Sequence, residues 1–201
     1  QRVGQRSLLK IYTTSILAIL ERIRLTQHGG SVVLSRTPLS NQLAHFTYTV
    51  SEHAGLADEI IAYKTLDDLL REPHADFDTA AELERCRVEL ELHRTSRKLI
   101  RGISQISRLA AVDGAVLLDD HLRIQGFGVR FPVLLPPGVT ILDALTGSEY
   151  SCDQWGLRHQ SVFSACHKCE QAIGLIVSQD GEVKAVKADG DRLMFWDGIL
   201  E

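Results

Sequence analysis

Two short motifs hold most of the residues that could bind an anion or move a proton. The first is Arg158-His159, which follows Gly156 and precedes a helix that Ser161 is expected to cap. Free backbone N–H groups at a helix start attract anions, and an arginine adds a bidentate donor suited to phosphate. His159 can add a hydrogen bond or move a proton. The motif is typical of a phosphate loop, and a surface arginine beside an ordinary capping turn is the alternative.

The second motif, Asp113-Gly114-Ala115, lies where a long helical pattern gives way to a strand. Glycine and alanine have little side-chain bulk, so the base or the phosphates of a ligand could approach this backbone closely. The Asp113 carboxylate is a hard oxygen ligand of the kind that divalent cations prefer. An ordinary turn would show the same three residues.

A third group, Cys166-His167-Lys168-Cys169, raises the question of a zinc or redox site. A structural zinc ion needs four ligands, and no second cysteine pair accompanies this one. A redox-active cysteine is expected near a helix N-terminus, whereas both of these fall inside a predicted helix. We therefore expect buried, unreactive thiols and no zinc.

Hydrophobic spacing and turn residues predict the elements that must position these motifs. Helices are expected at 5–27, 58–70, 78–112 and 161–172, the third with a bend at Gly102, and strands at 31–35, 44–50, 115–118, 122–129, 174–178, 183–187 and 192–196. Helices alternating with groups of strands indicate an α/β fold, a mixed β-sheet flanked by helices, with long N-terminal and central helices. We expect an N-terminal helix (1–30) followed by one domain (31–201).

Composition limits the functions that are open to this chain. Of its 201 residues 44% are hydrophobic and 24% charged, which is typical of a soluble globular protein. The formal net charge of −4 argues against direct nucleic-acid binding, which a basic surface normally drives. Charged residues interrupt the longest apolar stretch, at 8–25, so no membrane span is expected. The start of the sequence shows no secretory signal, and we expect a cytoplasmic protein with reduced thiols.

Together the two motifs resemble the nucleotide-binding core of the diadenylate cyclases. The resemblance runs through LAAVDGAVLLDDHLRIQGFGVRF and GLRHQSVFSACHKCEQAIGLIVSQDGEVKAV, about residues 95–197. That family has a DGA motif on one strand and a G-T-R-H-R motif at a helix start. The resemblance implies an Mg²⁺ or Mn²⁺ ion at Asp113 and a nucleotide held by Asp113, Gly114, Ala115, Phe127, Gly156, Leu157, Arg158, His159, Gln160, Ser161 and Ser178.

The sequence departs from the cyclase pattern at two positions. Leu157 replaces a threonine, and Gln160 replaces the second arginine of R-H-R. A cyclase must stabilise a transferring phosphoryl group there, and losing such a charged contact costs about 2–4 kcal/mol, or ~10²–10³ in rate. The pattern is closer to the predicted nucleotide-sensor branch of the fold, the DACNV-type domains, in which R-H-x-S follows an upstream His-Gly-Gly turn.

The sequence therefore predicts a sensor domain that binds a nucleotide or cyclic nucleotide, forms a homo-oligomer and lacks efficient cyclase activity. One alternative is an active diadenylate cyclase that makes cyclic di-AMP from two ATP molecules, with Asp113 assisting the attack of the 3'-hydroxyl through the metal. Another is a structural or interaction domain with a vestigial pocket.

Overall fold

The computed structural model describes residues 2–40, 43–50, 55–72, 79–133, 135–136 and 138–200. Its helices are α1 (Arg2–Leu25), α2 (Ala57–Arg71), α3 (Thr79–Ala110), the 3-10 helix η1 (Cys152–Gln154) and α4 (Leu157–Lys168). Its strands are β1 (Gly30–Ser35), β2 (Tyr48–Thr49), β3 (Ala115–Leu118), β4 (Ile124–Val129), β5 (Thr140–Asp143), β6 (Glu149–Tyr150), β7 (Ala172–Val177), β8 (Val183–Asp189) and β9 (Arg192–Trp196).

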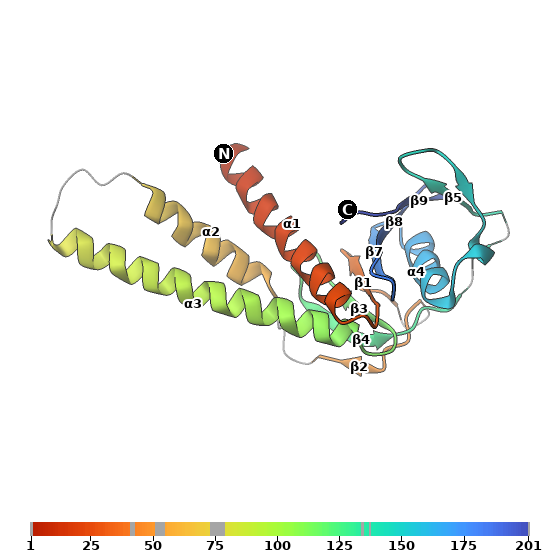
Figure 1. Cartoon of the computed structure of the whole chain (residues 1–201), viewed down its shortest axis with the longest axis horizontal. Helices are drawn as coiled ribbons and strands as arrows, with labels where there is room; N and C mark the ends of the chain where they lie inside the picture. Colours follow the sequence, from red (N-terminus) through yellow and green to blue (C-terminus); the bar gives the residue numbers. More distant parts are fainter. Residues whose placement is uncertain are drawn as a thin grey trace.

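All of these strands join one mixed sheet in the order β2-β4-β3-β1-β7-β8-β9-β5-β6. Strand β1 pairs with β3 in parallel and with β7 in antiparallel orientation. Helix α4 covers one face of the sheet, and α1 and α3 cover the other (Figure 1). This arrangement confirms the predicted α/β fold, a mixed sheet flanked by helices with long N-terminal and central helices.

The alternation of side chains along each strand builds a separate core on each face of the sheet. Val33 and Ile176 point toward α4 and pack with Phe163, whereas Val32 and Val177 pack among the residues of α1 and α3. Neighbouring residues of a strand face opposite sides, so a sheet covered on both faces needs nearly continuous apolar strands. The sequences of β1, β3 and β7 meet this requirement, and burial on both faces fixes their register.

Helices α1, α2 and α3 form an arm that projects beyond the sheet (Figure 1). The buried residues of α3 all fall between Thr95 and Ala110, so only the C-terminal half of this helix packs closely. Helix α3 continues through Gly102 without interruption, and the bend expected there stays a prediction. A Cβ at Gly102 would lie 2.3 Å from Cδ2 of Leu56, so this glycine lets the segment before α2 approach. The predicted start of the helix, residue 78, lies outside the described residues.

Two stretches differ from the sequence prediction. The strand expected at 44–50 is reduced to β2 and an isolated bridge between His45 and Arg130. Strands β5 and β6 were not predicted, because a short hairpin after a proline-rich loop has too little apolar alternation to be recognised. The Asp143 carboxylate stabilises the turn of this hairpin by accepting hydrogen bonds from the N–H groups of Leu145 and Thr146 at 2.8 and 2.9 Å.

Candidate functional site

Strands β3, β1 and β7 are neighbours in the middle of the sheet, and the start of β1, the start of β3 and the end of β7 lie side by side. The two predicted motifs lie close to these strand ends. The parallel register pairs Ser31 of β1 with Ala115 of β3, and the antiparallel register pairs Gly30 with Val177 of β7. Because neighbouring strands lie about 4.8 Å apart, these strand ends fall within about 10 Å of one another. We call residues 29–31, 113–115 and 177–178 the site edge.

Arg158 of α4 reaches the site edge at the turn that precedes β1. The backbone of Gly29 has a φ of +66°, and a Cβ placed there would lie 2.6 Å from Nη1 of Arg158 and 2.7 Å from the carbonyl oxygen of Val177. A residue with a side chain would meet both groups, so the turn requires glycine. The guanidinium of Arg158, from the first turn of α4, therefore lies beside the ends of β1 and β7.

Helix α4 begins four residues earlier than the sequence predicts. Gly156 is its N-cap residue, and no side chain caps the helix. The predicted cap by Ser161 is wrong, since its hydroxyl donates a hydrogen bond to the carbonyl oxygen of Arg158, 2.9 Å away within the first turn. The first N–H groups of α4 are therefore free of side-chain acceptors, and the helix dipole is directed at the loop before it.

Gln160 stabilises the loop that leads into α4. Its side-chain nitrogen Nε2 donates to the carbonyl oxygens of Trp155, at 2.7 Å, and Cys152, at 3.3 Å. These two bonds hold η1 against the start of the helix. Leu157, the other position that departs from the cyclase pattern, is exposed to solvent.

His159 is half-buried beside aromatic rings. Its ring centroid is 5.1 Å from that of Trp155 and 6.2 Å from that of Phe163. Burial, the ammonium of Lys184 and the guanidinium of Arg158 all lower the pKa of His159. The imidazole is therefore neutral at pH 7 and can offer a hydrogen bond but no charge. Its Nε2 is buried and has no partner among the described residues.

Sequence reasoning missed the cation beside these rings, Lys184. Its side chain is buried, its ammonium donates to Asp197 at 2.6 Å and also binds Glu182, and it lies 5.9 Å from the centroid of the Trp155 ring. Burial lowers the pKa of Lys184, but the bonds to Asp197 and Glu182 outweigh burial and raise it overall. The alternating pattern of β8 gives no signal for this residue, because a lysine in a short strand normally faces solvent.

Asp113 lies at the start of β3 and forms an ion pair with Arg130, a second residue that sequence reasoning missed. The carboxylate is 3.2 Å from a guanidinium nitrogen, and both side chains are exposed. Arg130 directly follows β4, so only the pairing of β3 with β4 could have indicated this contact. Pairs between exposed charges contribute about 0–1 kcal/mol, so Asp113 can exchange this partner for a ligand at little cost.

Gly114 allows the close approach of two backbones at the site edge. Its φ is +105°, and a Cβ there would lie 2.6 Å from the carbonyl carbon of Gly128. The hydroxyl of Ser31 lies 3.5 Å from the carbonyl oxygen of Gly114 and donates to it. The DGA motif therefore has a steric role in the fold besides any role in binding.

The structure separates Phe127 from the other predicted site residues. Its ring packs with the core formed by α1 and α3, on the face of the sheet opposite α4, and stacks on Tyr48 with centroids 4.7 Å apart. Arg158 and Phe127 therefore cannot line one pocket on the same face. Ser178, in contrast, follows β7 at the site edge, where its N–H donates to the carbonyl oxygen of Glu182 at 2.9 Å.

The two cysteines of the CxxC pattern differ from each other. Cys166 is fully buried, as predicted, and burial raises the pKa of its thiol to about 12. Cys169 was expected inside the helix, but α4 ends before it, and its sulfur lies 3.6 Å from the hydroxyl of Ser35 and 3.7 Å from that of Thr37. Within the described ranges, no group of three or more His, Cys, Asp or Glu side chains could hold a metal ion.

Comparison with known proteins adds little to this geometry. No protein-family model matches the chain, and no curated protein matches it. Among solved structures, a hypothetical membrane spanning protein from Bacillus cereus is similar over 91% of this chain, with 16% identity and a TM-score of 0.46. The match covers 62% of that protein's chain, and likeness at this level carries no argument about function. In the part of this chain that the structure describes, no helix has the length and apolarity to cross a membrane.

Proposed function

We propose that the site edge binds a nucleotide or cyclic nucleotide and that the protein acts as a sensor of that ligand. The observation that carries the proposal is that Arg158 reaches the turn at Gly29, close to the start of β3 where the DGA motif lies. Two motifs more than 40 residues apart thus meet at one place (158 − 114 = 44). Each motif alone has an ordinary structural explanation, and their meeting favours a shared ligand.

The chemistry of the edge suits a phosphate ester. Arg158 and the uncapped N–H groups of α4 are donors for phosphate oxygens. Gly114 is half-buried, and its accessible part would contact the base or sugar. Asp113 would hold Mg²⁺ or Mn²⁺ jointly with the phosphates, because such ions commonly take one or two carboxylates and complete their shell with phosphate oxygens. Phe127 is not part of this proposal, since it lies on the other face.

The position of the edge also suits a sensor. Residues 26–29 connect α1 to β1, and residues 111–114 connect α3 to β3, so two helices of the arm end at the site edge. A ligand that shifts either turn would act directly on the arm. The proposed homo-oligomer would respond through these helices, and sedimentation with and without ligand would detect a change in its size.

Isothermal titration of the full chain with ATP, cyclic di-AMP and related nucleotides tests the binding proposal. A charge-assisted contact is worth about 1.5–3 kcal/mol, so Arg158→Ala should weaken binding by about 10- to 150-fold. The matched control is Arg192→Ala, which removes an exposed arginine from the start of β9. Unchanged affinity in Arg158→Ala would remove the phosphate assignment, and absence of binding to the native chain would favour a vestigial pocket.

Cyclase activity is the alternative that the resemblance leaves open. The side chain of Gln160, at the position of the second cyclase arginine, is bonded to the carbonyl oxygens of Trp155 and Cys152 and brings no charge. This favours binding over catalysis. Incubation with ATP and Mn²⁺ followed by chromatography decides the matter, since robust formation of a cyclic dinucleotide would overturn the sensor-only proposal.

A further inference from the structure

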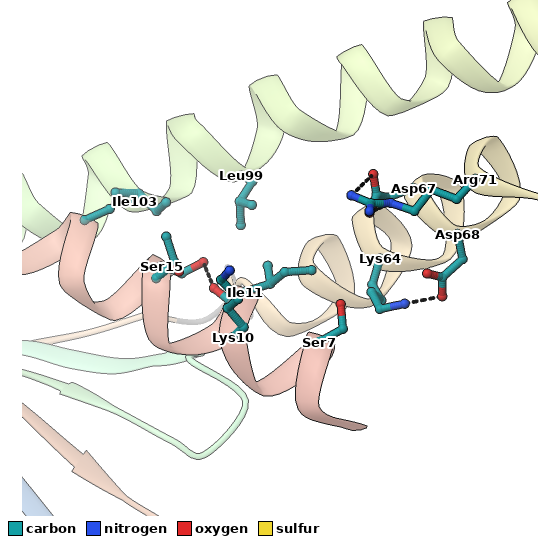
Figure 2. Close-up of a pocket in the computed structure, with 12 residues that line it drawn as sticks. Ser7, Lys10, Ile11, Ser15, Lys64, Asp67, Asp68, Arg71, Leu99 and Ile103 are labelled. Carbon is teal, nitrogen blue, oxygen red and sulfur yellow. Dashed lines mark hydrogen bonds and ion pairs between the residues drawn. The ribbon is translucent and has the colours of Figure 1, made fainter. Parts of the chain in front are cut away.

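The inward face of α2 changes from apolar to charged along its length. Ala57, Ile60 and Lys64 follow the i, i+3, i+7 spacing of one helix face, and all three are buried. Asp67 and Arg71 continue this face and point toward α1 and α3 (Figure 2). Two apolar residues of the same stretch face solvent, with Ile61 52% and Leu69 44% exposed, whereas Leu66 and Leu70 are half-buried.

The charged face of α2 lines a cavity of about 760 Å³ between the three helices of the arm. Its opposite wall comes from α1 and α3, whose apolar contributions include Ile11, Leu99 and Ile103 (Figure 2). The volume is in the range of small-molecule sites, which are about 300–1,000 Å³. The wall from α2 is therefore charged, and the wall from α1 and α3 combines apolar side chains with polar ones, Lys10 among them.

Lys64 differs from a lysine on an ordinary solvent-exposed helix face because it is buried. The residue is only 9% exposed, and its ammonium pairs with Asp68. An ammonium has three donor hydrogens, and burying donors without acceptors is costly. Asp68 accepts from this ammonium, and a carboxylate or phosphate in the cavity would be a further acceptor.

The charges around the cavity also favour an anion. Lys10, Lys64 and Arg71 are its cations and Asp67 and Asp68 its anions, which leaves one excess positive charge (3 − 2 = 1). Arg71 is held by Asp67, at 2.9 Å between Nε and Oδ2. Lys10 is exposed and makes no ion pair with any carboxylate that the structure describes.

We propose that this cavity binds a small amphipathic anion, with a carboxylate at Lys64 and Lys10 and an apolar chain along Ile11, Leu99 and Ile103. The cavity is lined by residues of α1, α2 and α3, and these helices lie on the other side of the sheet from α4 (Figure 1). The inference is thus independent of the nucleotide proposal, and either can fail alone. Occupancy would fix the spacing of the helices that end at the site edge.

Titration of the full chain with decanoate tests this inference. We expect decanoate to bind saturably, 1:1, with a Kd below about 1 mM. Decanol, which has the same chain without the charge, should bind at least about tenfold more weakly. Acetate, which has the charge without the chain, should not reach saturation. Lys64→Met keeps the length of the side chain and should raise the Kd for decanoate at least about tenfold. Its control, Lys98→Met, removes an exposed lysine of α3 that does not line the cavity and should change the Kd less than about twofold.

Lys10→Met provides a second variant that does not disturb the packing, because Lys10 is exposed. It should raise the Kd for decanoate about threefold, and together with the decanol comparison it decides the question if Lys64→Met fails to fold. The inference is overturned if decanoate shows no saturable binding, if decanol binds as tightly, or if the lysine variants and Lys98→Met behave alike.

Discussion

Replacement of Gly29 by alanine probes the contact on which the proposed site depends. The side chain would enter the space between Nη1 of Arg158, at 2.6 Å, and the carbonyl oxygen of Val177, at 2.7 Å. The backbone there has a φ of +66°. Gly190→Ala is the matched control, since its φ is +58° and no atom lies within 4 Å of the added Cβ. The pair separates backbone strain from crowding.

The expected magnitudes follow from these two terms. An alanine in the left-handed region costs about 1–2 kcal/mol, and both variants share this cost. Crowding adds about 1–3 kcal/mol at Gly29, because the carbonyl of Val177 belongs to β7 and cannot move without disturbing its pairing with β1. We therefore expect Gly29→Ala to lower the free energy of unfolding by about 2–5 kcal/mol and Gly190→Ala by about 1–2 kcal/mol.

Urea denaturation of both variants measures the difference. A double variant, Gly29→Ala with Arg158→Ala, should recover part of the loss but not all of it, because the clash with Val177 remains. Equal destabilisation by Gly29→Ala and Gly190→Ala would refute the close approach of Arg158 and β7 to this turn. The site edge described above would then lose its central contact.

Three further outcomes are expected. Gln160→Ala should lower the free energy of unfolding by about 1–2 kcal/mol by removing two bonds to loop carbonyls, whereas Gln171→Ala, at an exposed loop position, should have little effect in the same urea assay. Because the pKa of His159 is lowered in the folded state, its contribution to stability is complete above the ordinary pKa of 6.5 and is lost as the pH falls through the lower folded pKa. Urea midpoints measured from about pH 7.5 to about pH 5 should therefore fall less in His159→Phe than in the native protein. Iodoacetamide should modify exposed Cys86 in the native protein and Cys166 only after unfolding, as peptide mass spectrometry would show, because a thiol with a pKa of about 12 forms almost no thiolate.

Local sequence determined much of the fold. The periodic apolar residues of α1 and α3 and the continuous apolar runs of β1, β3 and β7 set the element types, because burial on one helix stripe or on both strand faces leaves a distinct pattern. The turn at Gly29 could be recognised for the same reason, since few residues other than glycine adopt a positive φ there. Short elements such as β5 and β6 left no comparable signal.

Tertiary structure decided what the motif residues contact. Gln160 and Ser161 look alike in the sequence as polar residues near a helix start, yet one bonds the preceding loop and the other bonds the first helical turn. Phe127 lies on the far face of the sheet because irregular pairing between β3 and β4 shifts the alternation of side chains.

The same holds for the charged residues that proved most informative. Lys184 and Lys64 occur in stretches whose polar pattern predicts solvated side chains, and only the packing of α4 on β8 and of α1 on α2 encloses them. The spacing of apolar residues shows which side of a single helix or strand is buried, whereas the burial of a charged side chain depends on which other elements pack against it. The sequence alone determined the long helices and the central strands and predicts an anion site at the start of α4, and the tertiary structure decided which charges are buried and what they contact.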